Sequence, residues 1–338
     1  MLTPSYYPRA GGVEKHVRMV CRELHHAGHD IRIATPRWDD GWPERETVDG
    51  LEVTRLSPSG RVGRRQLAPL VKWADIVHTH DAYPFLKYYL PFRFRYPLKP
   101  VFVTFHGYEG YPIPFEAKVL RRIVLGLTTG NICAGAFIPK WYRFRCGKVT
   151  HGGTAPHPRP LSTSGEGGTA AVFVGRLEPD TGFLTYLEAL RMLKAEYDVA
   201  LPLEVCGDGS LRAEGERIAA EAGLAVTFHG RVPDVTPYLA GARFVFTSGF
   251  LGMLEAMAAG AVVCAVYDNP LKEDYLRLFP GAESILIAGS AAELAREVQE
   301  LASDEAGATA LAEQGRAFAQ EQTWAKVAEL YLELYGVQ

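Results

Sequence analysis

Glycines, histidines and an arginine stand directly after several short β-rich runs of this sequence. Ligands of open parallel sheets bind beyond the carboxyl ends of the strands, so residues in such positions are the first candidates for chemistry. These residues are Gly11-Gly12, His78, His80, His106-Gly107, Arg176, Gly207-Asp208-Gly209 and Ser248-Gly249. Glycine lets a ligand approach the backbone, and arginine suits a phosphate. The glycines and the arginine therefore favour binding of a phosphorylated ligand.

Gly11 and Gly12 open a predicted helix over residues 13–27. A helix N-terminus offers free N–H groups and about half a positive charge, which together suit a phosphate. A simple turn explains a Gly-Gly pair equally well. The pair does not form the G-x-G-x-x-G pattern, and no strand-end acid follows about 20 residues later, so a dinucleotide site is not favoured.

Three histidines follow or end predicted strands. His106 ends a strongly β-rich run and precedes Gly107, a position that suits ligand contact, although a lone histidine is more often structural. His78 and His80, two residues apart, share one face of a strand and could form half of a metal site. No third ligand is evident, so the sequence favours a structural or hydrogen-bonding role for this pair.

Two charged residues stand in positions that predict a ligand. Arg176 follows the β-rich run 170–175 and places a cation at the mouth of the sheet, although a plain surface arginine fits as well. Glu255 lies among Leu, Ala and Met in the predicted helix 251–259. An unpaired acid there would be costly, so a ligand or partner is expected, and the diol of a ribose suits a carboxylate.

Strands that alternate with helices predict two α/β domains with parallel sheets. The predicted strands cover residues 30–35, 52–56, 75–80, 100–106, 131–136, 170–175, 203–207, 226–230, 243–247 and 261–267. The predicted helices cover residues 13–27, 182–194, 211–222, 251–259, 291–302 and 321–335. A Gly- and Pro-rich stretch at 152–168 is typical of a linker. Only Met1–Thr3 precede the first loop, which predicts a very short first strand or a start that lies upstream.

Composition excludes several classes of protein. The chain has 338 residues, 47% of them hydrophobic, and a formal net charge of −3, which rules out a disordered chain or a collagen. The five cysteines are scattered without a C-x-x-C pair, which favours a reducing compartment and no structural zinc. No apolar run reaches the roughly 20 residues of a spanning helix, and the first residues lack the features of a signal peptide. A cytoplasmic protein is expected.

Charge is distributed unevenly along the chain. Residues 1–150 carry a net charge of +10, whereas residues 151–338 carry −13. Basic and aromatic side chains alternate in residues 87–99 and 140–148, which predicts contact with an anionic membrane surface or a lipid acceptor. A solvated basic face is the simpler alternative, and nucleic-acid binding is not favoured.

Motifs along nearly the whole chain resemble the family-4 retaining glycosyltransferases of the GT-B fold. In the first half they are Tyr7-Pro-x-x-Gly11-Gly12-Val-Glu, Glu23-Leu-x-x-x-Gly28-His29, Asp75-Ile-Val-His-Thr-His80 and Thr104-Phe-His106-Gly107. In the second half they are Val174-Gly-Arg176-Leu, Gly207-Asp-Gly209-Ser-Leu, Phe228-His-Gly230-Arg-Val and Leu254-Glu255-Ala-Met-Ala-x-Gly260. The last motif is fairly specific, and the others are strong only together.

The resemblance implies two Rossmann-like domains that face a cleft. An acceptor-binding domain would span residues 1–150, a linker 151–168 and a nucleotide-sugar-binding domain 169–318, with a helix at 319–338 that crosses back to the first domain. The enzyme would transfer a sugar from a nucleotide-sugar, UDP- or GDP-linked, to a glycan, lipid-linked or small-molecule acceptor with retention. No metal and no cofactor would be needed, because cations and helix N-termini stabilise the leaving phosphate.

The resemblance also assigns site residues. His106 would contact the transferring sugar and Arg176 the diphosphate, and these two are the catalytic candidates. The remaining donor-binding candidates are Gly11 and Gly12 at the diphosphate and reaction centre, Arg231 and Val232 at the base, Glu255 at the ribose, and Thr181, Ser248, Gly249, Phe250 and Leu251. The acceptor-binding residues are not identified.

Two positions depart from the family pattern. Thr181 stands where a lysine is usual, and Thr247 stands where a sugar-contacting glutamate is usual. The alternatives are therefore a catalytically impaired sugar-nucleotide-binding partner of another glycosyltransferase, or a GT-B sugar-nucleotide epimerase; the absent G-x-G-x-x-G pattern argues against an oxidoreductase. Lys272, which follows the predicted strand 261–267, is a candidate replacement for the missing lysine.

Overall fold

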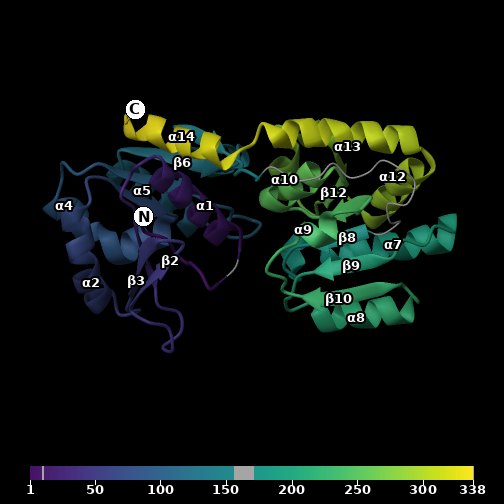
Figure 1. Ribbon diagram of the computed structural model, residues 1–338, viewed down its shortest axis with the longest axis horizontal. Helices are drawn as coiled ribbons and strands as arrows, with labels where there is room; N and C mark the ends of the chain where they lie inside the picture. Colours follow the sequence, from purple (N-terminus) through teal and green to yellow (C-terminus); the bar gives the residue numbers. More distant parts are fainter. Residues whose placement is uncertain (10, 156–170, 338) are drawn as a thin grey trace. The chain divides into compact units, whose positions relative to one another are not determined.

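The computed structural model describes residues 1–9, 11–155 and 171–337, which form two compact units. Unit 1 consists of Met1–Gly152 and Trp324–Gln338, and unit 2 of Gly153–Thr323. Most of the predicted linker, residues 156–168, lies outside the described residues. Each unit is an α/β assembly around a mainly parallel sheet, as the sequence predicts (Figure 1).

Unit 1 contains two runs of strands, in the orders β2-β3-β1 and β4-β5-β6-β7. They are β1 (Arg32–Pro36), β2 (Arg45–Val48), β3 (Leu51–Leu56), β4 (Val77–His80), β5 (Val101–Phe105), β6 (Gly130–Ala134) and β7 (Lys148–Thr150). Only β2, which the sequence analysis missed, pairs in antiparallel fashion. Leu2 forms parallel bridges to both Ala34 and Thr79. This single residue, which precedes the glycine loop at Gly11 and Gly12, therefore connects the two runs of strands. Both alternatives for the start of the chain, a very short first strand or a start that lies upstream, are compatible with this bridge.

Helices cover the sheet of unit 1. They are α1 (Gly12–His26), α2 (Gly60–Trp73), α3 (Ala82–Pro84), the π-helical η1 (Phe85–Tyr89), α4 (Leu90–Arg95), α5 (Phe115–Leu127), α6 (Phe137–Tyr142) and α14 (Trp324–Tyr335). The predicted apolar face of α1 is confirmed, since Val17, Cys21 and Leu24 are buried. Helix α14 packs along α1, which confirms a last helix that returns to the first domain (Figure 1).

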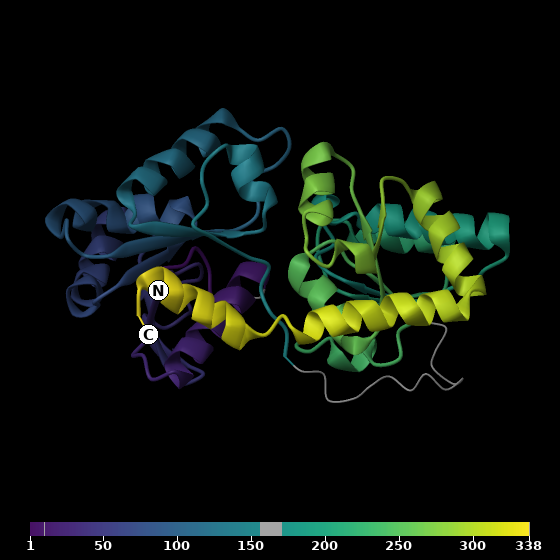
Figure 2. The same ribbon diagram turned by 90° about the horizontal axis from the view of Figure 1, so that it is seen from above.

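The last predicted helix, residues 321–335, begins three residues too early. The chain leaves the helical conformation after α13 (Glu305–Gln320), where Thr323 forms a bridge with Thr154, and it becomes helical again at Trp324 (Figure 2). Residues 321–323 contain neither glycine nor proline, so the sequence has no strong signal for the break.

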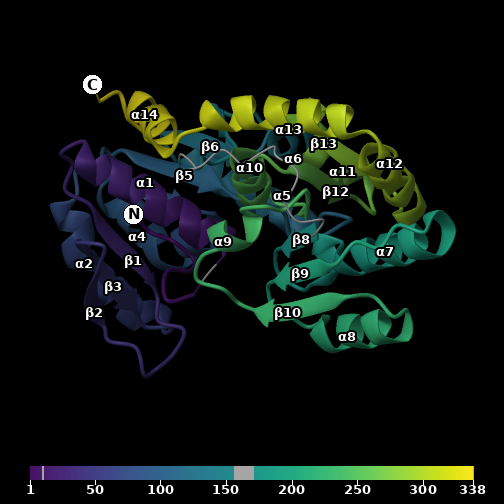
Figure 3. The ribbon, with the colours of Figure 1, turned by 45° about the vertical axis from the view of Figure 1, so that its right-hand side comes forward.

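Unit 2 has one sheet in the order β10-β9-β8-β11-β12-β13, and all its described strand pairs are parallel (Figure 3). The strands are β8 (Ala171–Val174), β9 (Leu203–Cys206), β10 (Val226–Gly230), β11 (Phe244–Phe246), β12 (Val262–Val266) and β13 (Ile285–Ala288). The helices are the 3-10 turn η2 (Pro179–Thr181), α7 (Phe183–Tyr197), α8 (Arg212–Glu221), α9 (Thr236–Leu239), α10 (Phe250–Ala259), α11 (Pro270–Arg277), η3 (Ala282–Ser284), α12 (Ala291–Ser303) and α13.

The core of unit 2 forms between the sheet and the helices α7 and α12. Phe173, Leu187 and Phe246 are buried in it, with less than 2% of their surface exposed. Parallel strands covered on both faces read as continuous apolar runs, which is why the sequence predicted most of them. Within the described part of the chain, no helix has the length and apolar character that crossing a bilayer requires.

Candidate functional site

In unit 1, His16 of α1 and His78 of β4 belong to one buried hydrogen-bond network. The Tyr331 hydroxyl lies 2.9 Å from His16 Nε2 and 2.9 Å from Thr104 Oγ1. Thr104 Oγ1 is in turn 2.8 Å from His78 Nε2, and the Tyr335 hydroxyl is 2.8 Å from His78 Nδ1. We call these five residues the histidine network; it joins α1, β4, β5 and α14. His78 therefore has the hydrogen-bonding role that the sequence favoured.

His106 lies beside this network at the end of β5. Its Nε2 is 2.9 Å from His80 Nδ1, and the two rings are stacked with their centres 5.2 Å apart. The His106 backbone N–H donates to Asp81 Oδ1 over 2.7 Å. The ring of His16 lies 4.9 Å from that of His106. Since Gly12 precedes His16 by one helical turn, the structure brings the glycine loop and His106 together within unit 1.

Burial keeps these histidines neutral. It lowers the pKa of His16 to about 4, and it lowers the pKa values of His78, His80 and His106 well below their usual range. A neutral imidazole has one donor and one acceptor nitrogen, and the hydroxyls of Thr104 and Tyr335 on the two sides of the His78 ring can match both. Burial raises the pKa of Asp81 to about 7, against the opposing effects of Arg121 and the His106 N–H.

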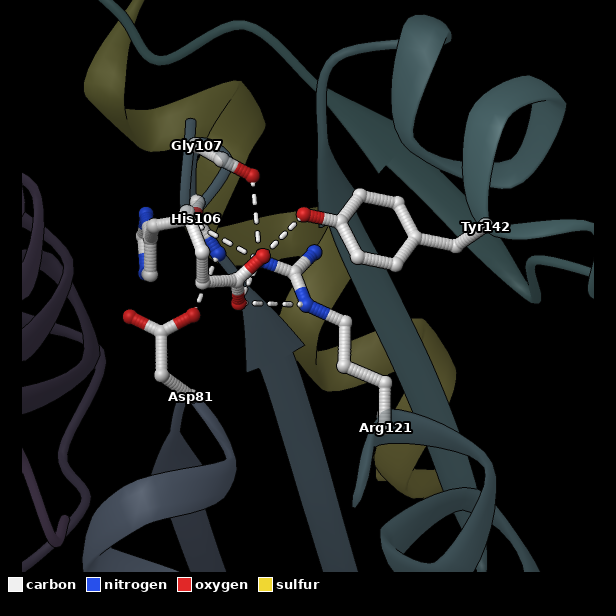
Figure 4. Close-up of polar contacts among 6 residues, drawn as sticks. Asp81, His106, Gly107, Arg121 and Tyr142 are labelled. Carbon is white, nitrogen blue, oxygen red and sulfur yellow. Dashed lines mark hydrogen bonds and ion pairs between the residues drawn. The ribbon is translucent and has the colours of Figure 1, made fainter. Parts of the chain in front are cut away.

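Arg121 fixes the loop that follows His106 (Figure 4). Only 3% of Arg121 is exposed, and its Nη2 donates to Gly107 O over 3.1 Å and to Glu109 Oε1 over 2.9 Å. The Tyr142 hydroxyl donates to the other oxygen of Glu109. Gly107 has φ +52°, which a residue with a side chain would adopt only under strain. The backbone around His106 is therefore held in one conformation.

Sequence reasoning missed Asp81, Arg121, Glu109 and Tyr142. Asp81 had a usable signal, because it follows His80 directly at the end of a strand. Arg121 had none, since an arginine on a helix is usually exposed.

The glycine loop is open at the start of α1. Gly11 is the N-cap in extended conformation, and a Cβ on Gly12 would meet no atom within 4 Å. Packing inside unit 1 therefore gives no reason for a glycine at position 12, whereas a ligand that approaches the backbone would give one. A Cβ on Gly11 would lie 2.5 Å from Glu14 Oε2, so a carboxylate already lies beside the N-terminus that an anion would use.

In unit 2, neighbouring parallel strands bring Arg176, Ser248 and Lys272 to the same end of the sheet, where the carboxyl ends of the strands lie. Phe173 of β8 pairs with Phe246 of β11, which pairs with Cys264 of β12, and the three polar residues follow these strands.

Arg176 is the exposed cation at this end of the sheet. Its side chain is 62% exposed and donates from Nη2 to Asp180 Oδ2 over 2.8 Å. Thr181 lies in the same turn and donates from Oγ1 to Glu178 O over 2.7 Å. The guanidinium thus has one exchangeable partner, and Thr181 supplies no charge.

Lys272 is buried at the same end of the sheet. Only 7% of it is exposed, and its Nζ donates to Ser248 O over 2.7 Å. Burial lowers its pKa to about 8, although the charges of Asp180 and Asp268 raise it. The Ser248 hydroxyl lies 2.6 Å from the Tyr186 hydroxyl, so the strand end that Lys272 contacts is itself fixed by hydrogen bonds.

The remaining donor candidates are spread over unit 2. Gly249 is the N-cap of α10, Phe250 stacks on Tyr275 at 4.0 Å between ring centres, and Leu251 and Glu255 are half-buried on the same helix. Arg231, exposed, and Val232, half-buried, follow the edge strand β10, which β9 separates from β8.

Thr247 is buried against α10. Only 3% of it is exposed, and a Cβ on Gly252 would lie 2.5 Å from Thr247 Oγ1. This side chain packs under the helix, where a glutamate would not fit without a shift. Across the ranges that the structure describes, no group of three or more His, Cys, Asp or Glu residues could hold a metal ion.

Comparisons with known proteins cover both units. The family described as Glycosyltransferase Family 4 matches residues 10–141, and the family described as Glycosyl transferases group 1 matches residues 168–304. A phosphatidyl-myo-inositol mannosyltransferase from Mycolicibacterium smegmatis is 25% identical over 313 residues, and the match covers 78% of this chain and 75% of that protein.

Solved structures share the fold at low sequence identity. Sucrose-phosphate synthase from Thermosynechococcus elongatus has a TM-score of 0.72 at 20% identity and covers 99% of this chain and 97% of its own. HepE from Anabaena in complex with UDP has a TM-score of 0.73 at 14% identity and covers 99% and 98%. These similarities confirm the predicted GT-B fold.

Proposed function

Because the chain belongs to the group 1 glycosyltransferases of family 4, and is thus an enzyme that transfers a sugar from a nucleotide-sugar, we propose that the transfer retains the anomeric configuration and needs no metal ion. The transferred sugar is a hexose or a related sugar. The acceptor is a glycan, a lipid-linked molecule or a small molecule.

The observation that carries this proposal is the place of Arg176. It is a cation at the carboxyl end of a parallel sheet, paired only by the exposed Asp180 among the described residues. A diphosphate would replace Asp180 and gain bidentate hydrogen bonds from the guanidinium. A fixed cation there stabilises the charge that develops on the leaving phosphate, which is the task a metal ion performs in other enzymes.

We assign the other groups of the donor to residues on the same basis. Glu255 binds the ribose hydroxyls, the backbone at Arg231 and Val232 meets the base, and the start of α10 from Ser248 to Leu251 approaches the phosphates and the sugar. In unit 1, His106 contacts the sugar while the loop at Gly11 and Gly12 admits the diphosphate. HepE, which shares the fold, was solved with UDP bound, so UDP-sugars are the first donors to test.

The test is product formation from UDP- and GDP-sugars with a mixed pool of acceptors, with and without EDTA. We expect transfer that EDTA does not change and a product whose anomeric configuration, measured by NMR, equals that of the donor. Inversion, or loss of transfer in EDTA that added metal restores, would contradict the proposal.

A second candidate function rests on Thr181 and Thr247. Thr181 is neutral, and Thr247 is buried under α10, so two donor contacts typical of the family are absent from their usual positions. A chain that binds nucleotide-sugars without transferring them would show saturable binding but no product. An epimerase would convert the donor sugar in the absence of an acceptor.

We also propose that unit 1 contacts an anionic membrane surface from the cytoplasmic side. Phe94 is 69% exposed and Leu98 94% exposed, and both lie among the basic side chains Arg93, Arg95 and Lys99. Apolar side chains enter the interface, and each basic residue adds about 1 kcal/mol near an anionic leaflet.

Vesicle co-sedimentation tests this contact. We expect binding to anionic vesicles at low salt that weakens at high salt, with little binding to neutral vesicles. The double variant Phe94→Ser with Leu98→Ser should bind less, whereas Val62→Ser, an exposed apolar control on α2, should bind as the wild type does. No binding of the wild type at low salt would rule the contact out.

A further inference from the structure

Lys272 is a buried cation without an anionic partner in the described part of unit 2. It is the third residue of α11, and 7% of it is exposed. Its Nζ donates to Ser248 O over 2.7 Å and lies 4.3 Å from the centre of the Tyr275 ring. Neither contact carries a negative charge.

Such a charge is costly to bury. An ammonium has three N–H donors and normally retains water or a carboxylate, and a carbonyl with an aromatic face replaces only part of that. Burial lowers the pKa of Lys272 only to about 8, so the group remains largely charged at neutral pH. A buried cation that forms no salt bridge gains from binding an anion, because its removal from water is otherwise poorly compensated.

The surroundings of Lys272 indicate where that anion lies. Ser248 and Lys272 follow the adjacent strands β11 and β12, and Arg176 follows β8 on the other side of β11. The charges of Asp180 and Asp268 raise the pKa of Lys272, and the charge of Arg176 lowers it, although no carboxylate forms a salt bridge with Lys272 among the described residues. Helix α10, ten residues long, begins beside Ser248 and directs its N-terminal N–H groups to this end of the sheet. Two cations and a helix N-terminus therefore lie at the same end of the sheet.

We propose that Lys272 binds the diphosphate of the donor together with Arg176, from a different loop, and that Asp180 occupies this anion site when no nucleotide is bound. The proposal rests on the proposed function for the identity of the ligand. Lys272 would be a binding residue in its own right, because the anion supplies the negative charge that its buried position lacks.

Calorimetric titration with UDP, GDP and inorganic pyrophosphate tests this role. Lys272→Met removes the charge at nearly constant volume and should weaken pyrophosphate and nucleotide binding by roughly 10- to 100-fold, the range for a charge-assisted hydrogen bond. Lys194→Met is the matched control, since Lys194 is exposed near the end of α7, and it should bind as the wild type does. Thr181→Lys, which adds a cation next to Asp180, should restore part of the affinity of Lys272→Met.

A second variant covers the case in which Lys272→Met does not fold. Asp180 is 51% exposed, so Asp180→Asn should fold, and it removes the competing carboxylate. It should tighten pyrophosphate binding by about 2- to 5-fold, the range of an exposed charge pair. Unchanged pyrophosphate affinity in both variants, or in Asp180→Asn where Lys272→Met does not fold, overturns the proposal.

The outcomes separate this proposal from the proposed function. Normal nucleotide affinity and turnover in Lys272→Met would overturn the role of Lys272 and leave the glycosyl transfer intact. Pyrophosphate binding that depends on Lys272, without sugar transfer by the wild type, would support the role of Lys272 and contradict the proposed glycosyl transfer. A wild-type protein that binds none of the three probes would overturn the role of Lys272 as well.

Discussion

The two units provide opposite kinds of functional site. Residues 1–150 are basic overall, yet the candidate site of unit 1 consists of neutral, buried histidines joined by hydrogen bonds. Residues 151–338 are acidic overall, yet the candidate site of unit 2 presents the cations Arg176 and Lys272. Net charge therefore says little about a site, because a few positioned groups determine its field.

The two candidate sites should also differ in how much their substitutions affect stability. Arg176 is exposed and can be removed without opening a core, so its loss should change turnover alone. The histidine network is buried and shared among four elements, so damage to it should change both stability and activity. Substitutions and pH changes in the two units test this difference.

Arg176→Ala should give the largest effect on activity. Removal of one positioned charge-stabilising donor typically costs 10²–10³ in turnover, on the order of 3–4 kcal/mol. Arg176→Lys should recover only part, because an ammonium does not bind phosphate in bidentate fashion. The unfolding midpoint should stay that of the wild type. Turnover above about a tenth of wild type in Arg176→Ala would show that the diphosphate is held elsewhere.

Acidification should destabilise unit 1. His16 has a folded pKa of about 4, below the roughly 6.5 of an unfolded histidine, so below pH 6.5 the unfolded chain binds more protons. Between pH 6.5 and 5, His16 alone should cost about 2 kcal/mol of folding free energy. His78, His80 and His106 act in the same direction. Asp81 opposes them, since its raised pKa favours the folded state as the pH falls through about 7.

Tryptophan fluorescence during urea unfolding at pH 7 and pH 5 measures this effect in unit 1 alone. All the tryptophans of the chain belong to that unit: Trp38, Trp42, Trp73, Trp141 and Trp324. His16→Asn is the control and should reduce the pH dependence. An equal urea midpoint at both pH values would mean that the histidines are not buried as neutral groups.

Tyr331→Phe should produce a smaller loss of stability. It removes the hydroxyl that bonds both His16 and Thr104 and leaves those buried groups without that partner, at a cost of roughly 1–2 kcal/mol. Tyr83→Phe is the matched control, because Tyr83 is 45% exposed and its hydroxyl bonds the side chain of the half-buried Lys87. Equal urea midpoints for the two variants would show that the histidine network does not contribute to the stability of unit 1.

Thr181→Lys in the wild-type background should have the smallest effect. A cation added at a half-buried turn beside Asp180 is partly screened, and such pairs contribute about 0.2–1 kcal/mol. Donor affinity should rise by less than about 5-fold and turnover should persist. Abolished turnover would show that position 181 tolerates no charge and would count against the assignment of the donor site.

Local pattern predicted the elements that are buried on one face or strongly apolar. The sequence placed α1, β5, β12 and α10 within one or two residues of their bounds, because apolar periodicity and flanking glycines mark them. It missed α13, whose many Ala and Gly residues leave little apolar contrast, and β13, which is only four residues long. Both elements depend on tertiary packing more than on local pattern.

Site candidates were predictable where residues follow strands. His106, Arg176 and Lys272 were singled out in this way, and their roles stay predictions. Their partners were not singled out, because a hydrogen bond such as that between Tyr335 and His78 joins residues 257 positions apart, and no spacing rule reaches that far. Arg121 was missed because its burial follows from contacts with a loop, not from its place on a helix.

Helix α14 makes unit 1 discontinuous in sequence, whereas unit 2 is continuous from Gly153 to Thr323. On the ribosome, unit 2 can therefore fold as soon as its own residues emerge, while unit 1 stays unfinished although its first 152 residues were made earlier. Until Tyr331 and Tyr335 arrive, His16, His78 and Thr104 lack the tyrosine hydroxyls that bond them in the finished protein. The half of the enzyme that is synthesised first is thus the half completed last.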